Sequence, residues 1–161
     1  MHTAAVVTCS DRSAAGDRED RSGPALVALL REAGFRIGDP IVVPDDRATI
    51  ADTLRRLAAD DVALVVTTGG TGFSPRDITP EATLDVADRL APGLGEAMRA
   101  AGRAITPKAD LSRGIVAVLG STIVVNTPGS TAGATESLEA IVDLLPHALG
   151  LLRETPEGDH G

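Results

Sequence analysis

Apolar residues along this chain follow two patterns that alternate from one segment to the next. Short continuous apolar runs predict strands at residues 4–8, 62–66, 115–119 and 122–126, and an extended segment at 35–43 that Pro40 interrupts. Apolar residues spaced three and four apart predict helices at 22–33, after Asp46, at 79–90, at 93–105 and across 138–152. Pro146 is expected to kink or split the last helix near Val142.

The order of these elements indicates the fold class. Strands that alternate with helices and are apolar along their whole length are typical of an α/β domain with a largely parallel sheet. Gly120-Ser121 lies between the last two strands, which is a signal for a β-hairpin. We therefore predict a single domain over residues 1–161, a three-layer α/β/α sandwich with a mostly parallel sheet plus a C-terminal β-hairpin. Residues 154–161 are predicted to form a flexible tail.

Composition narrows the function classes. The chain has 161 residues and a formal net charge of −8, with two Phe and no Trp or Tyr. An acidic chain without aromatic platforms argues against nucleic-acid binding, because phosphate backbones require a basic surface. No run reaches the roughly 20 apolar residues of a membrane span, and the N-terminus carries no secretory signal. The single Cys9 fits a reducing compartment, so we expect a cytoplasmic protein in which Cys9 is a packed residue rather than a nucleophile.

The most informative segment is the loop at residues 67–77, Thr-Thr-Gly-Gly-Thr-Gly-Phe-Ser-Pro-Arg-Asp, which follows an apolar strand. Glycines let the backbone approach a ligand closely, and threonine hydroxyls add hydrogen-bond donors. The helix that begins at Thr79-Pro80 adds partial positive charge. This combination suits a phosphate-bearing ligand, with Asp77 placed to hold a metal ion. The alternative is a tight turn whose glycines serve geometry alone.

Four polar segments follow predicted strands, and in such sheets ligands bind beyond the carboxyl ends of strands. The segments are Ser10–Arg12, Asp45-Asp46, Thr67–Asp77 and Asn126–Ser130. Two carboxylates near phosphates, here Asp45 and Asp77, are the arrangement that holds Mg²⁺, which takes few protein ligands plus phosphate oxygens. Structural alternatives are a helix N-cap at Asp45 or Asp46, a helix start at Asp77, a capped turn at 10–12 and a helix cap after Asn126. Lys108 and Arg113 are expected to be solvated charges.

Taken together, these segments resemble the molybdopterin adenylyltransferase family, the MogA/MoaB group of molybdenum cofactor biosynthesis proteins. The resemblance rests on short motifs that occur in the family's order between about residues 4 and 152. The motifs lie at 10–12 (Ser-Asp-Arg), 43–46 (Val-Pro-Asp-Asp), 67–72, 76–83, 92–93 (Pro-Gly), 111–113 (Leu-Ser-Arg) and 126–130 (Asn-Thr-Pro-Gly-Ser).

The resemblance implies a protein that is usually a homotrimer and that uses Mg²⁺ to transfer AMP from ATP onto the terminal phosphate of molybdopterin. The family's two key acidic positions fall on Asp45 and Asp77, the predicted catalytic residues and metal ligands. The predicted substrate-binding residues are Ser10, Asp11, Thr68, Gly69, Gly70, Thr71, Gly72, Ser112, Pro128, Gly129 and Ser130. Because the acceptor phosphate is already nucleophilic, catalysis reduces to positioning and charge neutralisation.

One motif leaves the activity open. Residues 128–131, Pro-Gly-Ser-Thr, are closer to the MoaB branch than to the adenylyltransferases, which often have Pro-Gly followed by Asn or Gln and a second Pro. The alternative is therefore a non-catalytic, MoaB-like molybdopterin-binding or carrier protein of the same pathway. A third possibility is a trimeric scaffold that serves a partner enzyme. Since the sequence carries no metal-insertion domain, we expect a separate downstream metal-insertion protein to take the product.

Overall fold

A computed structural model of the chain describes residues 1–154. One sheet has the strand order β2-β1-β4-β7-β6-β5, and β3 also pairs with β1. The strands are β1 (Thr3–Cys9), β2 (Arg36–Ile37), β3 (Ile41–Val43), β4 (Leu64–Thr68), β5 (Arg89–Leu90), β6 (Val116–Leu119) and β7 (Thr122–Thr127). Pairs among β1, β2, β3, β4 and β7 are parallel, whereas β5–β6 and β6–β7 are antiparallel. The mostly parallel sheet with a C-terminal hairpin is therefore confirmed.

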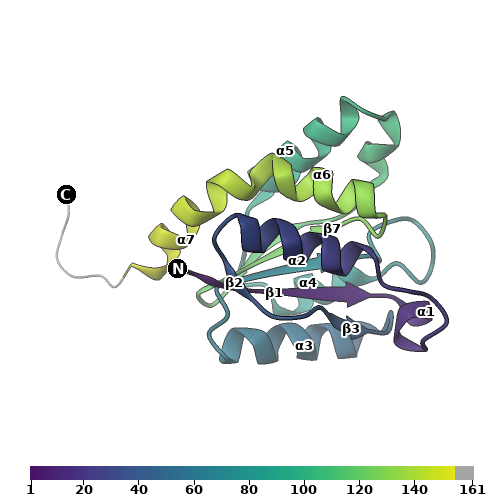
Figure 1. Ribbon diagram of the computed structural model, residues 1–161, viewed down its shortest axis with the longest axis horizontal. Helices are drawn as coiled ribbons and strands as arrows, with labels where there is room; N and C mark the ends of the chain where they lie inside the picture. The colour runs from purple at the N-terminus through teal and green to yellow at the C-terminus, as the bar shows by residue number, and fades with distance from the viewer. Residues whose placement is uncertain (155–161) are drawn as a thin grey trace.

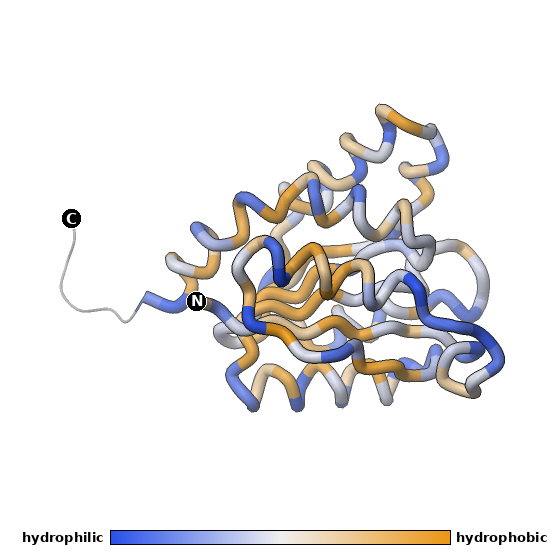
Figure 2. The backbone as a smooth tube through the Cα atoms, in the orientation of Figure 1, coloured by the Kyte–Doolittle hydropathy of each residue, from blue (hydrophilic) through white to orange (hydrophobic). Residues whose placement is uncertain are grey.

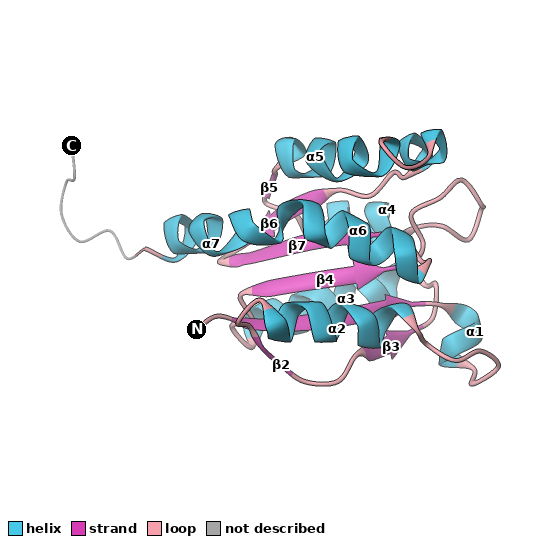
Figure 3. Cartoon of the chain, turned by 45° about the horizontal axis from the view of Figure 1, so that its top comes forward, coloured by secondary structure: helices cyan, strands magenta, loops and turns pink. Residues whose placement is uncertain are grey.

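Helices cover both faces of this sheet (Figures 1 and 3). One face carries α2 (Ser22–Glu32), α5 (Pro92–Arg103), α6 (Thr131–Ile141) and α7 (Leu145–Arg153), and the other carries α3 (Arg47–Ala59) and α4 (Thr79–Val86). In β4 the buried Leu64 and Val66 belong to the first core and Val65 to the second, as the two-residue repeat of a strand requires. Figure 2 shows the resulting arrangement, with apolar strands between the helices.

Shorter elements complete the description. Ser10 alone separates β1 from α1 (Asp11–Ala14), and its side chain caps α1 by accepting from the backbone N–H of Ser13. Two 3₁₀ helices are η1 (Pro107–Leu111) and η2 (Val142–Leu144). η2 separates α6 from α7, so the predicted interruption near Val142 is confirmed. Within residues 1–154, no helix has both the length and the hydrophobicity needed to cross a membrane.

The helix predicted at 79–90 is wrong in its last turn. α4 ends at Val86, and Arg89–Leu90 form β5 on the edge of the hairpin. The backbone N–H of Asp88 donates to the carbonyl of Val118 at 2.8 Å, and that of Ala91 donates to the carbonyl of Val116 at 2.8 Å. Residues 89–90 therefore pair with the open edge of β6, although their local sequence pattern favours a helix. Similarly, β4 runs two residues later than the predicted strand, because Thr67 and Thr68 stay in the ladder with β7.

Asp60 and Asp61 place negative charge at the C-terminal end of α3, where positive charge is favoured, and the structure explains how this is offset. Asp61 adopts a left-handed backbone with a φ of 60°, which ends the helix. Nη2 of Arg153 lies 3.1 Å from Oδ1 of Asp61 and also donates to its carbonyl oxygen at 3.3 Å. The cation that favours a helix C-terminus thus comes from the far end of the described chain. Residues 155–161, most of the predicted tail, lie outside the described residues.

Candidate functional site

The carboxyl ends of the parallel strands meet at one edge of the sheet. Thr8, Thr68 and Thr127 are aligned across β1, β4 and β7, and Cys9 pairs with Val43 of β3. The segments that follow are joined by hydrogen bonds: the N–H of Ser10 donates to the carbonyl of Val43 at 2.9 Å, and Oγ1 of Thr68 donates to the carbonyl of Pro128 at 2.7 Å. All four predicted segments therefore lie together.

The glycine loop needs its glycines for close approach. Gly69 and Gly70 both have a positive φ, of 97° and 70°. A side chain at Gly69 would collide with the carbonyl oxygen of Cys9, and one at Gly70 would collide with the hydroxyl of Thr79. The loop is thereby pressed against the end of β1 and the start of α4, with no room for a Cβ atom at either position.

One carboxylate oxygen of Asp45 accepts a hydrogen bond, and the other has no hydrogen-bond partner. Its Oδ2 accepts the backbone N–H of Asp11 at 3.1 Å, while its own N–H donates to Oδ1 of Asp11 at 2.9 Å. Its Oδ1 is buried and has no hydrogen-bond partner. Burial, followed by the nearby negative charges of Asp11 and Asp77, raises the pKa of this carboxyl above its ordinary value. The helix cap that was the alternative role belongs to Asp46, which accepts the N–H of Thr49 at 2.9 Å.

Asp77 lies at the other end of the same loop. Its Oδ2 accepts the N–H of Ser74 at 3.0 Å and would lie 2.8 Å from a Cβ atom placed on Gly72. The N-cap of α4 is Ile78, without a side-chain hydrogen bond, so Asp77 does not cap that helix. Asp45 and Asp77 thus approach the glycine loop at Gly70 and Gly72, two residues apart.

Asp11, a predicted binding residue, is in the lining of neither of the two cavities described below. Its Oδ2 accepts from Nε of Arg76 at 3.1 Å and from Nη2 of the same guanidinium at 2.5 Å. This hydrogen-bonded cation is the main reason that the pKa of Asp11 lies below its ordinary value. Arg76 also donates to the carbonyl of Asp45 at 3.3 Å. The capped turn that was the alternative at 10–12 is present as the start of α1, and the cation that pairs with Asp11 comes from the glycine loop.

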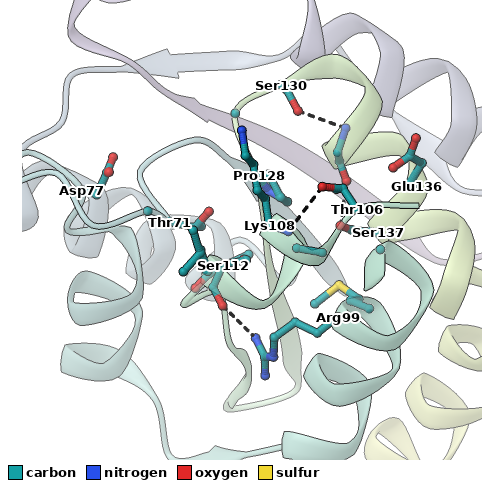
Figure 4. Close-up of a pocket in the computed structure, with 18 of the residues that line it drawn as sticks. Thr71, Asp77, Arg99, Thr106, Lys108, Ser112, Pro128, Ser130, Glu136 and Ser137 are labelled. Carbon is teal, nitrogen blue, oxygen red and sulfur yellow. Dashed lines mark hydrogen bonds between the residues drawn. The ribbon is translucent and has the colours of Figure 1, made fainter. Parts of the chain in front are cut away.

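A cavity of about 470 Å³ opens on one side of the loop (Figure 4). Most of the predicted binding residues line it: Gly70, Thr71, Gly72, Ser112, Pro128, Gly129 and Ser130, together with Asp77. Sequence reasoning missed further polar and apolar lining residues, namely Met98, Arg99, Thr106, Glu136 and Ser137, and expected Lys108 to be only solvated. They come from α5, η1 and α6, far from the loop in sequence.

A second cavity, of about 630 Å³, contains Ser10, Asp45, Thr68 and Gly69. Arg18, Arg21 and Ser22 also line it, and sequence reasoning did not select them. Gly70, Gly129 and Ser130 line both cavities, so the two are neighbours separated by these residues. Each cavity has one of the two predicted catalytic carboxylates: Asp77 in the first and Asp45 in the second.

Arg113 stabilises the glycine loop through hydrogen bonds to its backbone. Its guanidinium donates to the carbonyl of Gly72 at 2.7 Å, to that of Asp77 at 2.8 Å and to both oxygens of Glu81 at 3.0 Å. It also lies 5.9 Å from the ring centre of Phe73. The expectation that Arg113 is a solvated charge is wrong, because its donors hold both ends of the segment from Gly72 to Asp77.

Cys9 is buried, and burial raises the pKa of its thiol to about 12, in keeping with a packed residue.

The residues around Gly70 fit a small hard cation. Oδ1 of Asp45 and Oγ1 of Thr79 are both buried without a hydrogen-bond partner, and both lie against Gly70. Oxygen donors of this kind suit Mg²⁺. Across residues 1–154 no group of three or more His, Cys, Asp or Glu side chains could hold a metal by itself. A cation here would be completed by further oxygens, such as those of a phosphate or of water.

A family model described as a probable molybdopterin binding domain matches residues 5–147. The chain belongs to this family. The predicted family is thus confirmed, and the α/β fold described above is shared with solved structures of MoaB and MogA. The structure is similar to that of the molybdopterin biosynthesis enzyme MoaB of Thermus thermophilus over 97% of this chain and 99% of that chain, with a TM-score of 0.91 and 43% sequence identity.

Curated relatives within the family carry related names. Molybdopterin adenylyltransferase of Haemophilus influenzae is 40% identical over 144 residues, which are 86% of this chain and 72% of that protein. A molybdenum cofactor biosynthesis bifunctional protein of Synechococcus elongatus is 40% identical over 158 residues. These are 98% of this chain and 49% of that protein, so the chain spans about half of its length.

Proposed function

We propose that this protein transfers AMP from ATP to the terminal phosphate of molybdopterin, with release of pyrophosphate. The observation that carries the proposal is the pair of adjoining cavities, each lined by one of the two predicted catalytic carboxylates, that share Gly70, Gly129 and Ser130. A transfer between two bound molecules requires their reacting atoms to meet, and the shared residues mark where they can. The relatives named molybdopterin adenylyltransferase support the same reaction.

The chemistry of the linings supports a different substrate for each cavity. Met98, Ala109 and Leu111 give the first cavity apolar walls that suit a ring system, while Gly70–Gly72 and Lys108 suit its phosphate. In the second cavity Arg18, Arg21 and the hydroxyls of Ser10 and Ser22 would contact a triphosphate, and a cation bound with it would offset the carboxylates of Glu19, Asp20 and Asp45 in the same lining. Molybdopterin would therefore occupy the first cavity and ATP the second.

In the proposed step an oxygen of the molybdopterin phosphate forms a bond to the α-phosphorus of ATP. The bond from that phosphorus to the oxygen bridging to the β-phosphate breaks, and its electron pair leaves with pyrophosphate. Backbone amides of the glycine loop and the cap of α6 would orient the two phosphates in line. Mg²⁺, when bound, would neutralise phosphate charge, and Asp45 and Asp77, together with the hydroxyl of Thr79, are the residues that would hold it.

An anaerobic assay with purified molybdopterin tests the proposal. Pyrophosphate should form from ATP only when molybdopterin and Mg²⁺ are both present. Asp52→Asn serves as a control, because Asp52 is exposed, pairs only with Arg55 within residues 1–154 and is in the lining of neither cavity. Pyrophosphate release that does not depend on molybdopterin would contradict the proposal.

A second candidate is a molybdopterin carrier without catalysis. The observation that favours it is Ser130, whose hydroxyl accepts the N–H of Gly133 at 3.0 Å as the N-cap of α6, leaving it less available to a substrate. A carrier would bind molybdopterin tightly and release no pyrophosphate with ATP under any condition. The scaffold alternative predicts instead a complex with a partner enzyme that forms without ATP.

We also propose a cytoplasmic homotrimer that passes its product to a separate metal-insertion protein. Large apolar side chains remain exposed on the single chain, among them Leu84, Ile105 and Leu151, and they offer area for contacts between copies. Sedimentation velocity should give three times the mass of the chain. A single species with the mass of one chain would contradict the trimer.

A further inference from the structure

Glu136 is an acidic residue that the roles described so far leave unused. It lies on α6, is half-buried and lines the first cavity. Across residues 1–154, its carboxylate takes part in no hydrogen bond or ion pair, whereas Asp11, Asp45, Asp77 and Glu81 all accept from the protein. An unpaired carboxylate beside a cavity is available to a ligand with adjacent N–H donors.

The cavity has two chemically different ends. In Figure 4, Asp77 and Thr71 lie at one end, while Glu136 lies at the other, beside Thr106 and Ser137. The end with Asp77 has the glycine loop and suits phosphate. A ligand whose phosphate is held there would extend its ring system toward Glu136, past the apolar surface of Met98.

The ring of a pterin has an edge that matches a carboxylate. Its 2-amino group and its N3–H are two donors side by side, and a carboxylate offers two acceptor oxygens at the same spacing. We propose that Glu136 accepts both hydrogens and thereby selects the 2-amino-4-oxo ring of the substrate over rings with a different edge. This inference rests on the proposed function for its ligand, and it assigns a specificity-determining role to one residue.

The cations of the same cavity are the main competing partners for Glu136. Arg99 is engaged, since its Nη1 donates to the carbonyls of Ser112 and Gly114 at 3.3 and 2.8 Å. Lys108 is exposed and forms no ion pair with any carboxylate of residues 1–154. If Glu136 served only to neutralise Lys108, its loss would change the affinity for every phosphate ligand by the same factor.

A pair of ligands separates these two roles. One is the phosphate ester of 6-hydroxymethylpterin, and the other is its lumazine counterpart, in which oxygen replaces the 2-amino group. The same edge of lumazine offers one donor, N3–H, and one acceptor, the oxygen at position 2. That oxygen would lie against a carboxylate oxygen and be repelled by it. The chain has no Trp or Tyr, so ligand fluorescence can be titrated without a competing protein signal. The wild type should prefer the pterin on the order of 100-fold, because the lumazine loses one hydrogen bond to a charged group and places an oxygen against the carboxylate instead.

Glu136→Gln should reverse this preference. A carboxamide has one acceptor and one donor, so it complements the lumazine edge and mismatches the pterin edge. Glu136→Asp, with a shorter side chain, should weaken pterin binding without reversing the order. Glu139→Gln is the matched control, because Glu139 is on the same helix, exposed and absent from the cavity. It should retain the wild-type ratio.

The inference is overturned if Glu136→Gln keeps the wild-type ratio of affinities, if it weakens both ligands equally, or if the wild type binds neither ligand. The pyrophosphate assay with molybdopterin distinguishes its failure from that of the proposed function. A wild type that releases pyrophosphate while Glu136→Gln still prefers the pterin refutes only the role of Glu136. A wild type that selects the pterin but releases no pyrophosphate refutes only the transfer.

Discussion

Asp11 and Asp45 exchange hydrogen bonds in both directions, the backbone N–H of each donating to the carboxylate of the other at 2.9 to 3.1 Å. The exchange fixes which oxygen of Asp45 is occupied and leaves Oδ1 facing Gly70. Arg76 completes the arrangement by pairing with Asp11. Three segments distant in sequence thereby determine the orientation of one carboxylate.

Asp11→Asn should raise the Mg²⁺ concentration needed for half-maximal rate by about 10-fold, since residues that orient a metal ligand typically contribute 10- to 100-fold in affinity. The amide loses the charge that pairs with Arg76 but keeps an oxygen that can accept from Asp45. Excess Mg²⁺ should restore most of the maximal rate. Titration of the rate with Mg²⁺ checks this, with Asp52→Asn as the control; an unchanged Mg²⁺ dependence would show that Asp11 does not position Asp45.

Asp77→Asn should nearly abolish turnover and leave molybdopterin binding largely intact. The amide keeps an acceptor for the N–H of Ser74, so the loop should retain its shape while losing the charge proposed to hold Mg²⁺. Single-turnover rates and equilibrium binding give the two quantities separately. Equal losses of rate and of binding would refute the division of labour.

Asp45→Asn should make the protein without ligands equally or more stable near pH 7 while removing activity. The pKa of Asp45 is raised in the folded state, so ionisation opposes folding above that pKa and the opposition disappears as pH falls through it. The difference in thermal unfolding midpoint between variant and wild type should therefore be largest near neutrality and shrink toward pH ~4, the ordinary range for Asp. A variant that is less stable than the wild type at pH 7 would contradict this.

Gly70→Ala should destabilise the fold by about 1–3 kcal/mol, the usual range for a strained backbone position, and should also remove activity. The new methyl group meets the hydroxyl of Thr79 at a backbone with a φ of 70°. Gly150→Ala is the matched control, because it lies inside α7 with nothing near a Cβ atom, and it should be neutral or stabilising. Chemical denaturation of both variants measures the difference in free energy of unfolding.

Local patterns sufficed for most of the fold. The apolar runs and their spacing predict the alternation of strands and helices, and Pro146 and Gly120-Ser121 predict the break in the last helix and the hairpin. The pattern failed at Arg89-Leu90, where pairing with β6 outweighs the local preference for helix. Such a pairing depends on an edge that only the folded sheet presents.

The site residues that directly follow strands could be predicted from the sequence, whereas those that lie on helix faces could not. The motifs at Asp45, Gly69–Gly72 and Gly129 lie directly after strands, so their convergence follows from the parallel sheet. Met98, Arg99 and Glu136 reach the first cavity from the faces of α5 and α6, and their periodic spacing alone does not tell a cavity from a core. A weak signal was available at Gly133 and Ser137, small residues four apart that line the cavity on α6.

The burial of Cys9 has a consequence for the sulfur chemistry of the proposed substrate. Molybdopterin presents a dithiolene, whose two sulfur atoms are easily oxidised and must stay free to receive a metal. The one thiol of the chain is 3% exposed and stays protonated at neutral pH, so it is a poor partner for a mixed disulfide. The fold thus offers the dithiolene no reactive cysteine of its own, and sensitivity to air should reside in the ligand rather than in the polypeptide.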